Sequence, residues 1–449
     1  MSKALVVGMA KSGIGSAKLL FRNGYHVIIN DMKHDISGLN KALSGIQYEN
    51  KLGVDPKTLL DGVDLVVLSP VIPIFSELAK LAISRGIEVI GEIELGSRYC
   101  SPKTKFVCIS GTNGKTTCTA LTGEFFKEAG RHTFVLGNIG VPITEYAMDT
   151  RPGDTIVAEV AALQLESIRD FHANSAAMVN ISEDHLNRFE SMESYVAAKC
   201  RVFENQNEDD FAVLNYDDPT VRDMKRLTKA KVLYFSQKNE VEHGAFLKGN
   251  MMVWRENGVD TDIFMIDELL IPGRHNVENA LCCAVLALSN GISVETVRTV
   301  LRRFKGVEHR IEFVSEIGGI QYYNDSKGTN PDSTMRAVEA MSRPTILILG
   351  VGNYDKHSDF TPLFRVFGDA VKGVIASGIN VPAIMEAANR TGFRNIKVEN
   401  GSLGDMIEAA RKMAKPGYSV LLSPAAASWG MFSDFEERGR MFKEIVRTL

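Results

Sequence analysis

The sequence lacks any uninterrupted apolar stretch long enough to cross a bilayer, and it opens on a strand pattern rather than on the core of a signal peptide. It also lacks an excess of basic residues. The formal net charge of −4 gives no broad positive field for a polyanion such as nucleic acid. We therefore expect a cytoplasmic protein with no membrane and no nucleic-acid partner.

Cysteine is sparse and shows no metal-ligand spacing. The six cysteines include no C-x-x-C pair, and several fall within apolar helix or strand patterns. We expect them to be reduced residues of the core. They are Cys100, Cys108, Cys118, Cys200, Cys282 and Cys283.

The stretch 106–117 carries the strongest chemical signal in the chain. An apolar run ends in a glycine-bearing turn, and a lysine with two threonines leads into a helix-like segment at 118–129. Backbone N–H groups and the positive end of a helix bind polyphosphate, lysine adds a charge, and a threonine hydroxyl can ligate magnesium. We therefore expect an ATP site made of Gly111, Thr112, Asn113, Gly114, Lys115, Thr116 and Thr117.

This motif departs from the general P-loop pattern, which would place its first glycine at position 109, where the chain has isoleucine. A glycine and threonine turn without a ligand is the alternative interpretation. The sequence of strand, turn and helix that the motif requires is present, and this context favours the nucleotide site.

A second glycine-rich turn lies near the start of the chain. Gly8, Gly13 and Gly15 follow an apolar run at 4–7, and Asp31 closes the next apolar run. The spacing does not fit G-x-G-x-x-G, so the pattern gives little support to an NAD site. A turn that only packs a strand against a helix is equally plausible. The neighbouring ATP loop favours a pocket for a nucleotide-bearing substrate.

Short apolar runs alternate with helical patterns from end to end, without repeats or low-complexity segments. This alternation is typical of α/β units with parallel sheets, and 449 residues favour about three domains. We expect a Rossmann-like N-terminal domain at 1–98, a central P-loop ATPase-type domain with a parallel sheet at 99–305, and a C-terminal Rossmann-like domain at 306–449. Glycine and asparagine turns predict a small antiparallel excursion at 232–270.

Further motifs follow the P-loop in a fixed order. They are Asn138, Glu159 with Gln164, His185, Lys199, and the segments 275–280, 308–310, 324–330, 355–356, 422–428 and 435–439. Together with Gly-Thr-Asn-Gly-Lys-Thr-Thr, they resemble the motifs of the Mur ligase family over nearly the whole chain. The last segment is similar to that of the members that add D-glutamate.

The resemblance implies a ligase that joins UDP-N-acetylmuramoyl-L-alanine to D-glutamate in peptidoglycan precursor synthesis. Joining a carboxylate to an amine in water is uphill, so the carboxylate first takes the γ-phosphoryl group of ATP and becomes an acyl phosphate. Two anions must meet in that step, and positive charge offsets their repulsion. We expect ATP and two Mg²⁺ ions as the cofactors, and a monomer.

The resemblance also assigns the catalytic residues Lys115, Glu159, His185 and Lys199. Thr116 and Glu159 would ligate a first magnesium ion, and His185 would help to hold a second. Lys199 would be carbamylated by CO₂, which turns a cation into an anion that supports the metal. Without the surrounding motifs, a single lysine on a helix is usually a solvated charge.

Contacts to the substrates are assigned in the same way. ATP would contact Asn279, Arg310 and Asp325 in addition to the P-loop. The UDP substrate would contact Ser12, Gly13, Asp31, Ser69, Asn138 and Gln164, and D-glutamate would contact Lys327, Thr329, Lys356, Ser428 and Phe435. Structural alternatives stay open: Asn279 as a helix cap, Arg310 as an interdomain ion pair, and Gln164 as a partner of buried backbone.

Two departures from the family pattern concern the substrate. Ala161 and Ala162 stand where the family typically has two serines, and Val71 stands where it usually has glycine next to the diphosphate. An enzyme with altered substrate binding is expected. The alternatives are another amino-acid ligase of the superfamily, including a folylpolyglutamate synthase, and a nucleotide-binding homologue with weakened or no catalysis.

Overall fold

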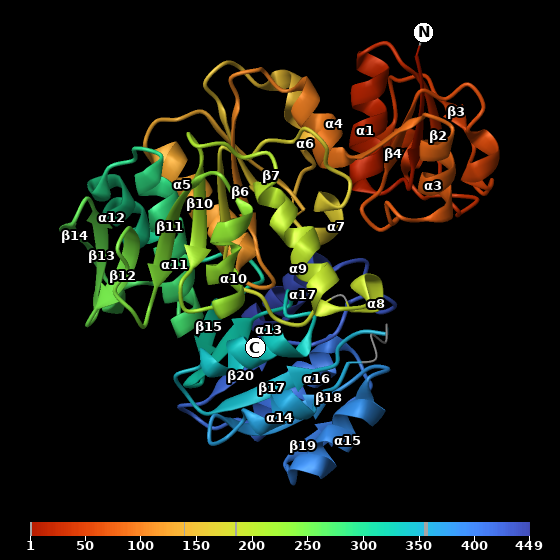
Figure 1. The fold of residues 1–449 in the computed structure, drawn as a ribbon. Helices are drawn as coiled ribbons and strands as arrows, with labels where there is room; N and C mark the ends of the chain where they lie inside the picture. Colours follow the sequence, from red (N-terminus) through yellow and green to blue (C-terminus); the bar gives the residue numbers. More distant parts are fainter. Residues whose placement is uncertain (1, 139, 185, 354–357) are drawn as a thin grey trace. The chain divides into compact units, whose positions relative to one another are not determined.

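The computed structural model describes residues 2–138, 140–184, 186–353 and 358–449. Strands alternate with helices over most of this part of the chain, the consecutive strands at 231–265 and 312–324 apart, which confirms the predicted α/β class (Figure 1). The chain divides into two compact units, Met1–Glu268 with Glu278–Arg302, and Leu269–Val277 with Arg303–Leu449. The first unit contains two sheets and the second contains one.

The first sheet is parallel throughout, in the order β3-β2-β1-β4-β5. The strand order reverses between β1 and β4, so the carboxyl ends of these two strands form the crevice in which such sheets bind ligands. The elements are β1 (Lys3–Val7), α1 (Lys11–Arg22), β2 (His26–Asn30), α2 (Leu39–Ala42), β3 (Glu49–Asn50), β4 (Leu65–Leu68), α3 (Glu77–Ser84), β5 (Glu88–Gly91) and α4 (Glu92–Tyr99).

The second sheet has nine strands in the order β14-β13-β12-β11-β10-β9-β6-β8-β7. Its elements are β6 (Lys105–Ser110), α5 (Lys115–Glu128), β7 (Thr133–Gly137), α6 (Ile143–Tyr146), β8 (Thr155–Glu159), α7 (Ala162–Leu165), β9 (Ser175–Met178), α8 (Leu186–Phe189), α9 (Met192–Cys200), β10 (Phe211–Asn215), α10 (Pro219–Asp223), β11 (Lys231–Ser236), β12 (Gly244–Lys248), β13 (Met251–Glu256), β14 (Val259–Met265), α11 (Arg274–Ser289) and α12 (Val294–Arg303). The antiparallel excursion is present, but it begins only where β13 follows β12, because β11 pairs in parallel with β10 and β12.

The second unit contains a six-stranded sheet in the order β15-β16-β20-β17-β18-β19, parallel except for the edge pair β15 and β16. Its elements are β15 (Glu312–Ile317), β16 (Ile320–Asn324), α13 (Pro331–Glu339), β17 (Thr345–Leu349), α14 (Thr361–Arg365), β18 (Val371–Ala376), α15 (Val381–Thr391), β19 (Ile396–Val398), α16 (Leu403–Met413), β20 (Ser419–Leu422) and α17 (Phe435–Arg447). The antiparallel edge pair was not predicted.

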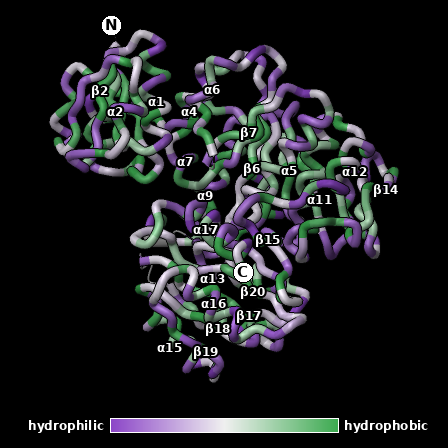
Figure 2. The backbone as a smooth tube through the Cα atoms, turned by 180° about the vertical axis from the view of Figure 1, so that it is seen from behind, coloured by the Kyte–Doolittle hydropathy of each residue, from purple (hydrophilic) through white to green (hydrophobic). Residues whose placement is uncertain are grey.

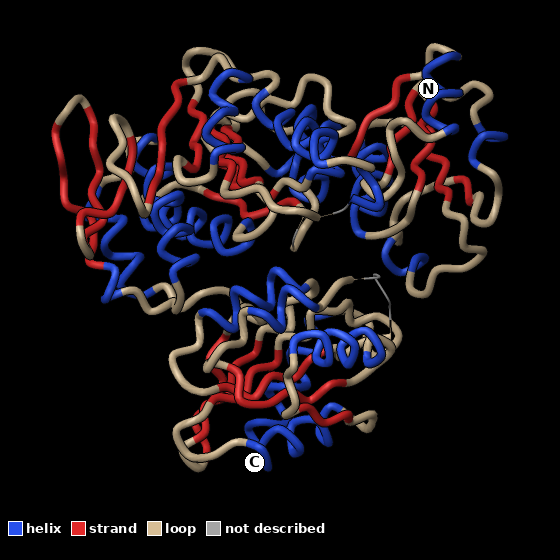
Figure 3. The backbone as a smooth tube through the Cα atoms, turned by 60° about the horizontal axis from the view of Figure 1, so that its bottom comes forward, coloured by secondary structure: helices blue, strands red, loops and turns tan. Residues whose placement is uncertain are grey.

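Apolar side chains of the strands and of the covering helices form the cores. Hydrophobic residues gather along the strands β6 and β7 and helix α5 (Figure 2), and most strands lie among helices, apart from the hairpin of β13 and β14 at the edge of the second sheet (Figure 3). All six cysteines are free and buried in these cores, as predicted. Within the described residues, no helix combines the length and the hydrophobicity that a membrane span requires.

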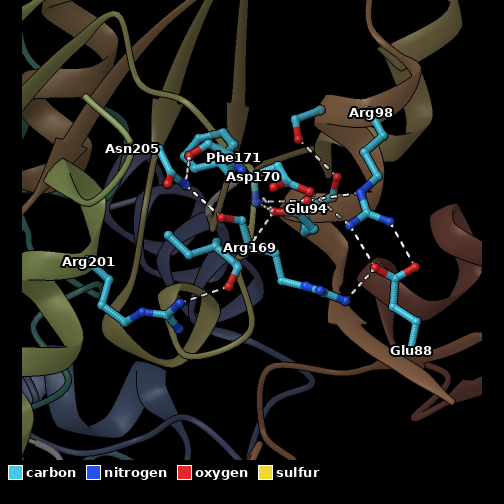
Figure 4. Close-up of polar contacts among 10 residues, drawn as sticks. Glu88, Glu94, Arg98, Arg169, Asp170, Phe171, Arg201 and Asn205 are labelled. Atoms are coloured by element: carbon cyan, nitrogen blue, oxygen red, sulfur yellow. Dashed lines mark hydrogen bonds and ion pairs between the residues drawn. The ribbon is translucent and has the colours of Figure 1, made fainter. Parts of the chain in front are cut away.

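Helix α4 connects the first sheet to the second and is fixed by a buried carboxylate. Glu94 is fully buried and accepts hydrogen bonds from the main-chain nitrogens of Arg169 (2.8 Å), Asp170 (3.1 Å) and Phe171 (2.9 Å) (Figure 4). Arg98 donates from Nε to the same carboxylate at 2.9 Å. Four donors compensate the loss of hydration that burial of this charge involves. Helix α4 is therefore tied firmly to the loop that precedes β9.

Glu92, on the same helix, is also buried, but fewer hydrogen bonds compensate for its lost hydration. Its Oε1 accepts hydrogen bonds from the nitrogen and the hydroxyl of Thr144 at 2.8 and 3.0 Å, while no partner among the described residues reaches its Oε2. Burial raises the pKa of Glu92 above the ordinary 4.5. The folded protein therefore keeps this proton at pH values where the unfolded chain has released it.

A Glu92→Gln substitution is accordingly expected to stabilise the protein more as the pH rises. Between the unfolded and folded pKa values of Glu92, the wild type loses about 1.4 kcal/mol per unit of pH, and the variant does not. Thermal unfolding midpoints measured across this range should diverge in favour of the variant. Glu77→Gln, at an exposed glutamate of α3, is the control. Parallel pH profiles of wild type and Glu92→Gln would contradict a raised pKa.

Candidate active site

The turn between β6 and α5 has the geometry of an anion site. Gly111 and Gly114 have φ angles of 142° and 85°, which glycine adopts at little cost. Asn180, which follows β9, fixes the turn: its main-chain oxygen accepts from Thr112 N and its Oδ1 accepts from Asn113 N, both at 2.9 Å. The turn thus presents the positive end of a 14-residue helix, which suits the phosphates of a nucleotide.

The side chains at the start of α5 meet the end of β8. Lys115 Nζ donates to the main-chain oxygens of Gly111 at 2.9 Å and Thr112 at 2.7 Å. Thr116 Oγ1 donates to Glu159 Oε2 at 2.8 Å, and Asn138 Nδ2 donates to Glu159 Oε1 at 3.1 Å. A hydroxyl and a buried carboxylate in contact form a donor set that magnesium prefers. The geometry also places Asn138, predicted as a contact of the UDP substrate, directly against Glu159.

Lys199 reaches the same turn from α9. It is only 2% exposed, its Nζ donates to the oxygen of Gly111 at 2.7 Å, and the ring of Tyr195 lies 4.8 Å from Nζ. Burial, and then the charge of Lys115, hold the pKa of Lys199 well below its usual value. Lys199 is therefore not the solvated helix charge that its sequence position alone would suggest. The neutral amine is therefore favoured more than in an exposed lysine.

Two predicted site residues, His185 and Lys356, lie outside the described residues. In the described part of the chain, no three histidine, cysteine, aspartate or glutamate side chains gather into a group that could hold a metal ion. Thr116, Glu159 and Lys199 around the P-loop are thus the metal-site candidates that the structure locates.

In the first sheet, the predicted contacts of the UDP substrate surround the crevice at β1. Asp31 Oδ2, after β2, accepts from Met9 N at 2.9 Å, which closes the turn after β1. Ser69, after β4, packs so closely on Gly8 that a side chain there would meet Ser69 Cβ at 2.5 Å. Gly13 lies in the first turn of α1, where an added Cβ would meet Gly8 O at 2.0 Å. Ser12 precedes it on the same turn.

Of the departures from the family pattern, Val71 has 72% of its surface exposed and is not among the residues with a positive φ. Its backbone therefore has no need of glycine in this structure. Ala162 is buried in a small cluster with Phe189 and Tyr195, where a serine hydroxyl would need a polar partner. Gln164 Oε1 accepts from Ala161 N at 3.0 Å, which is the backbone contact considered as the alternative to substrate binding.

Three residues were predicted to contact ATP beyond the P-loop. Asn279, on α11, is buried, and its Oδ1 accepts from the thiol of Cys118 on α5 at 3.4 Å. In the second unit, Asp325 is fully buried and accepts from Ser423 Oγ at 2.6 Å and from Ile311 N at 3.2 Å. Burial raises the pKa of Asp325.

Arg310 lies beside Asp325 in the second unit. It donates from Nη1 to Ser333 Oγ at 2.6 Å, and the same nitrogen lies 4.0 Å from Asp325 Oδ1. The contacts of Arg310 with both partners are therefore within the second unit.

Of the described residues predicted for D-glutamate, Lys327 and Thr329 follow β16, Ser428 follows β20, and Phe435 begins α17. Lys327 Nζ lies 5.5 Å from the centre of the Phe435 ring, so these two are close together. Thr329 follows Lys327 in the same loop. Ser428 is buried, and its main-chain oxygen accepts from the nitrogens of Met431 and Phe432.

Two side chains that organise these loops were not predicted. Asn180 holds the P-loop, as described above. Arg438 is fully buried on α17; its Nε donates to Ser326 Oγ at 2.9 Å, and its guanidinium also donates to the main-chain oxygens of Ser326, Val351 and Ala426. It joins the loops after three neighbouring strands. The available signal was its position, three residues after Phe435 at the start of an amphipathic helix.

Three family models match successive parts of the chain. Residues 2–91 match the Mur ligase MurD-like N-terminal domain, residues 109–287 match the Mur ligase middle domain, and residues 309–426 match the Mur ligase glutamate ligase domain.

Curated relatives match the chain over its full length. UDP-N-acetylmuramoylalanine–D-glutamate ligase of Thermoanaerobacter pseudethanolicus is 43% identical over 450 residues, which cover 100% of this chain and 98% of that protein. The protein of the same name from Alkaliphilus metalliredigens is 43% identical over 451 residues, with the same coverage.

Solved structures with much lower identity share the fold. A UDP-N-acetylmuramate-alanine ligase from Thermotoga maritima has a TM-score of 0.62 at 17% identity, and each chain is covered fully. A pseudomurein peptide ligase type C from Methanothermus fervidus has a TM-score of 0.59 at 18% identity, again over both full chains.

Proposed function

We propose that this chain, which belongs to the Mur ligase family, joins D-glutamate to UDP-N-acetylmuramoyl-L-alanine and converts ATP to ADP and phosphate. The product is a precursor of peptidoglycan. The observation that carries the proposal is the group of Lys115, Thr116, Glu159 and Lys199 around the P-loop, in a chain that matches D-glutamate ligases over its whole length. The protein acts as a monomer in the cytoplasm.

In this proposal, each of three domains binds a different substrate. The domain at 1–98 holds the UDP portion of the substrate at the crevice of the parallel sheet, through Ser12, Gly13, Asp31 and Ser69. The domain at 99–305 holds ATP, and the domain at 306–449 holds D-glutamate. The separate sheets described above, one in each range, support these boundaries.

Lys115 and the P-loop backbone promote transfer of the γ-phosphoryl group. The carboxylate of the muramoyl-alanine arm attacks γ-phosphorus, the bond from phosphorus to the ADP oxygen breaks, and an acyl phosphate forms. Lys115 lies at the turn where it offsets the repulsion between carboxylate and triphosphate. The amine of D-glutamate then attacks the acyl carbon, releases phosphate and forms the amide. Asn279, Arg310 and Asp325 complete the ATP contacts.

The donors around the P-loop fit magnesium. Thr116 and Glu159 would hold one ion, and His185 and Lys199 would support a second. When bound, the ions neutralise phosphate and carboxylate oxygens. Lys199 fits this role as a carbamate: its neutral amine adds to the carbon of CO₂, a proton leaves to solvent, and the buried side chain becomes an anion. Its burial and its lowered pKa support this modification.

Asn138 and Gln164 complete the contacts with the muramoyl-alanine arm. Both make intramolecular hydrogen bonds, to Glu159 and Ala161 respectively, which fix their orientation at the end of β8 and the start of α7. Val71, Ala161 and Ala162 replace none of the proposed metal or phosphate ligands.

A substrate panel tests the function. Purified protein is incubated with ATP, magnesium and UDP-N-acetylmuramoyl-L-alanine, and phosphate release is measured with D-glutamate, L-glutamate and other amino acids. Release that depends on D-glutamate supports the proposal. Release with another amino acid would assign a different acceptor, and no release with any of them would indicate a nucleotide-binding homologue.

The second unit supplies the D-glutamate site through Lys327, Thr329, Lys356, Ser428 and Phe435. Two carboxylates fixed at separate points direct the amine of one enantiomer toward the acyl phosphate, and the other enantiomer directs it away. Lys356 and Thr329 hold the side-chain carboxylate, an assignment made by resemblance.

Lys356→Ala is expected to raise the KM for D-glutamate by roughly tenfold or more, because a charge-assisted hydrogen bond of about 1.5–3 kcal/mol is lost. The KM for ATP should change little. Lys372→Ala, which removes a partly exposed lysine paired with Asp369 in the same unit, is the matched control. An unchanged D-glutamate requirement in Lys356→Ala would show that the pocket lies elsewhere.

A further inference from the structure

The guanidinium of Arg188 connects three segments of the first unit. Arg188 lies on α8; its Nη2 and Nε donate to Glu166 Oε2 and Oε1 at 2.5 and 3.3 Å, and its Nη1 donates to the main-chain oxygen of Val71 at 2.8 Å. Its guanidinium carbon also lies 5.5 Å from the centre of the Phe75 ring. The side chains of Arg188 and Glu166 are only 13% and 8% exposed, so solvent screens this pair less than a surface pair.

Glu166 is a rigid anchor for this contact because its loop is held from both sides. Arg201 donates to the main-chain oxygens of Leu165, Glu166 and Ile168. Asn205 donates to the oxygens of Arg169 and Phe171, whose nitrogens Glu94 binds (Figure 4). This loop also follows Gln164 directly. The position of Glu166 is therefore fixed relative to the end of β8.

Val71 belongs to the loop that continues β4 in the first sheet. Ser69, at the start of this loop, donates from its nitrogen to Val7 O at 2.9 Å and accepts from Ile72 N at 2.9 Å. Beyond this turn, Val71 is 72% exposed, and Phe75, whose ring lies against Arg188, is 49% exposed. The Arg188 contact with Val71 O is thus a direct link from this loop to the second sheet's domain.

We propose that Arg188 is a positioning residue that sets the β4 loop, with Ser69, at a fixed separation from helix α7, which carries Gln164. The inference rests on the proposed function, in which the β4 loop and α7 contact opposite ends of the UDP-muramoyl substrate. A long substrate binds well only if both contact points are in place before it arrives, because ordering a loop during binding lowers affinity. The planar fork of arginine bridges a carboxylate and a carbonyl, which a lysine ammonium does with less geometric precision.

The test measures binding of UDP-N-acetylmuramoyl-L-alanine by calorimetry without ATP, beside the KM for ATP and the thermal midpoint. Arg188→Ala is expected to weaken binding of the UDP substrate by roughly tenfold or more, and Arg188→Lys by less, while the KM for ATP stays within about twofold. Glu166→Gln should weaken the same binding. The double variant Arg188→Ala/Glu166→Gln should lose less binding free energy than the sum of the two single-variant losses, since both residues act through one contact. Arg85→Ala, at an exposed arginine paired with Asp61 in the first domain, is the control.

Rescue distinguishes positioning from general stability. A cavity of about 430 Å³ lined by Phe75, Glu166, Arg188 and Phe189 gives a small guanidinium access to the site. Millimolar methylguanidine should restore part of the affinity of Arg188→Ala for the UDP substrate. It should not raise the thermal unfolding midpoint of an unrelated variant. If Arg188→Ala does not fold, the same binding measurements on Arg188→Lys and Glu166→Gln test the inference.

Unchanged UDP-substrate binding in the folded variants would overturn the inference. Equal weakening of ATP and UDP-substrate binding, together with a lowered thermal midpoint and no rescue by methylguanidine, would also overturn it. Arg188 would then act on stability alone. If the wild type itself binds no UDP-muramoyl substrate, the proposed function fails first, and this inference fails with it.

Discussion

Lys115→Ala is expected to lower kcat by at least roughly 100-fold, the usual cost of removing a preorganised electrostatic group from an active site. Lys115 contacts two main-chain oxygens of the P-loop turn, so its charge lies at the proposed site of the phosphates. The loss arises in the phosphoryl-transfer step, where charge is redistributed among the phosphate oxygens. Steady-state kinetics of phosphate release measure it.

Lys127→Ala is the matched control, because Lys127 lies near the other end of α5 and pairs with Glu124 on the surface. The control should retain normal activity. Both variants should keep the circular dichroism spectrum and thermal midpoint of the wild type. Near-normal turnover of Lys115→Ala would remove the P-loop from the proposed mechanism.

The second large effect concerns Lys199. Lys199→Ala is expected to lose most of the activity, by roughly 100-fold or more, because a carbamate that supports a metal ion cannot form. The wild type should in addition lose activity when dissolved CO₂ is removed and regain it when bicarbonate is returned. Labelled bicarbonate should give a carbamate signal in the nuclear magnetic resonance spectrum of the wild type, and none in that of Lys199→Ala.

The pH dependence of this modification has a defined direction. Only the neutral amine reacts with CO₂, and burial lowers the pKa of Lys199, so carbamylation extends to lower pH than for an ordinary lysine. Lys127→Ala should respond to bicarbonate as the wild type does. A wild-type protein that is fully active without CO₂, or that shows no carbamate signal, would contradict the role of Lys199 as an anion.

Much of the fold could be predicted from local patterns. The strands β17 and β20 coincide with the apolar runs at 345–349 and 419–422, because buried parallel strands are continuous apolar runs bounded by polar residues. The antiparallel pair β15 and β16 was not predicted. Strand β15 lies at the edge of its sheet with mixed exposure, and such strands have no continuous apolar run.

The P-loop could be recognised because its chemistry is concentrated in seven consecutive residues, 111–117. The residues that support it could not, because their roles depend on contacts distant in sequence. Asn180 binds Asn113 across 67 positions, and Arg188 binds Val71 across 117. No spacing in the sequence relates such residues. The resemblance assigned individual contacts, but not the link of Asn138 to Glu159.

The proposed chemistry makes one prediction about the fate of a single atom. UDP-N-acetylmuramoyl-L-alanine with heavy oxygen in its carboxylate is incubated with ATP, magnesium, D-glutamate and the protein, and the phosphate and the amide product are analysed by mass spectrometry. If the carboxylate is phosphorylated before D-glutamate attacks, one heavy oxygen appears in each phosphate released. Phosphate that contains only solvent or ATP oxygen, or heavy oxygen recovered in AMP, would contradict an acyl phosphate and the proposed ligase reaction.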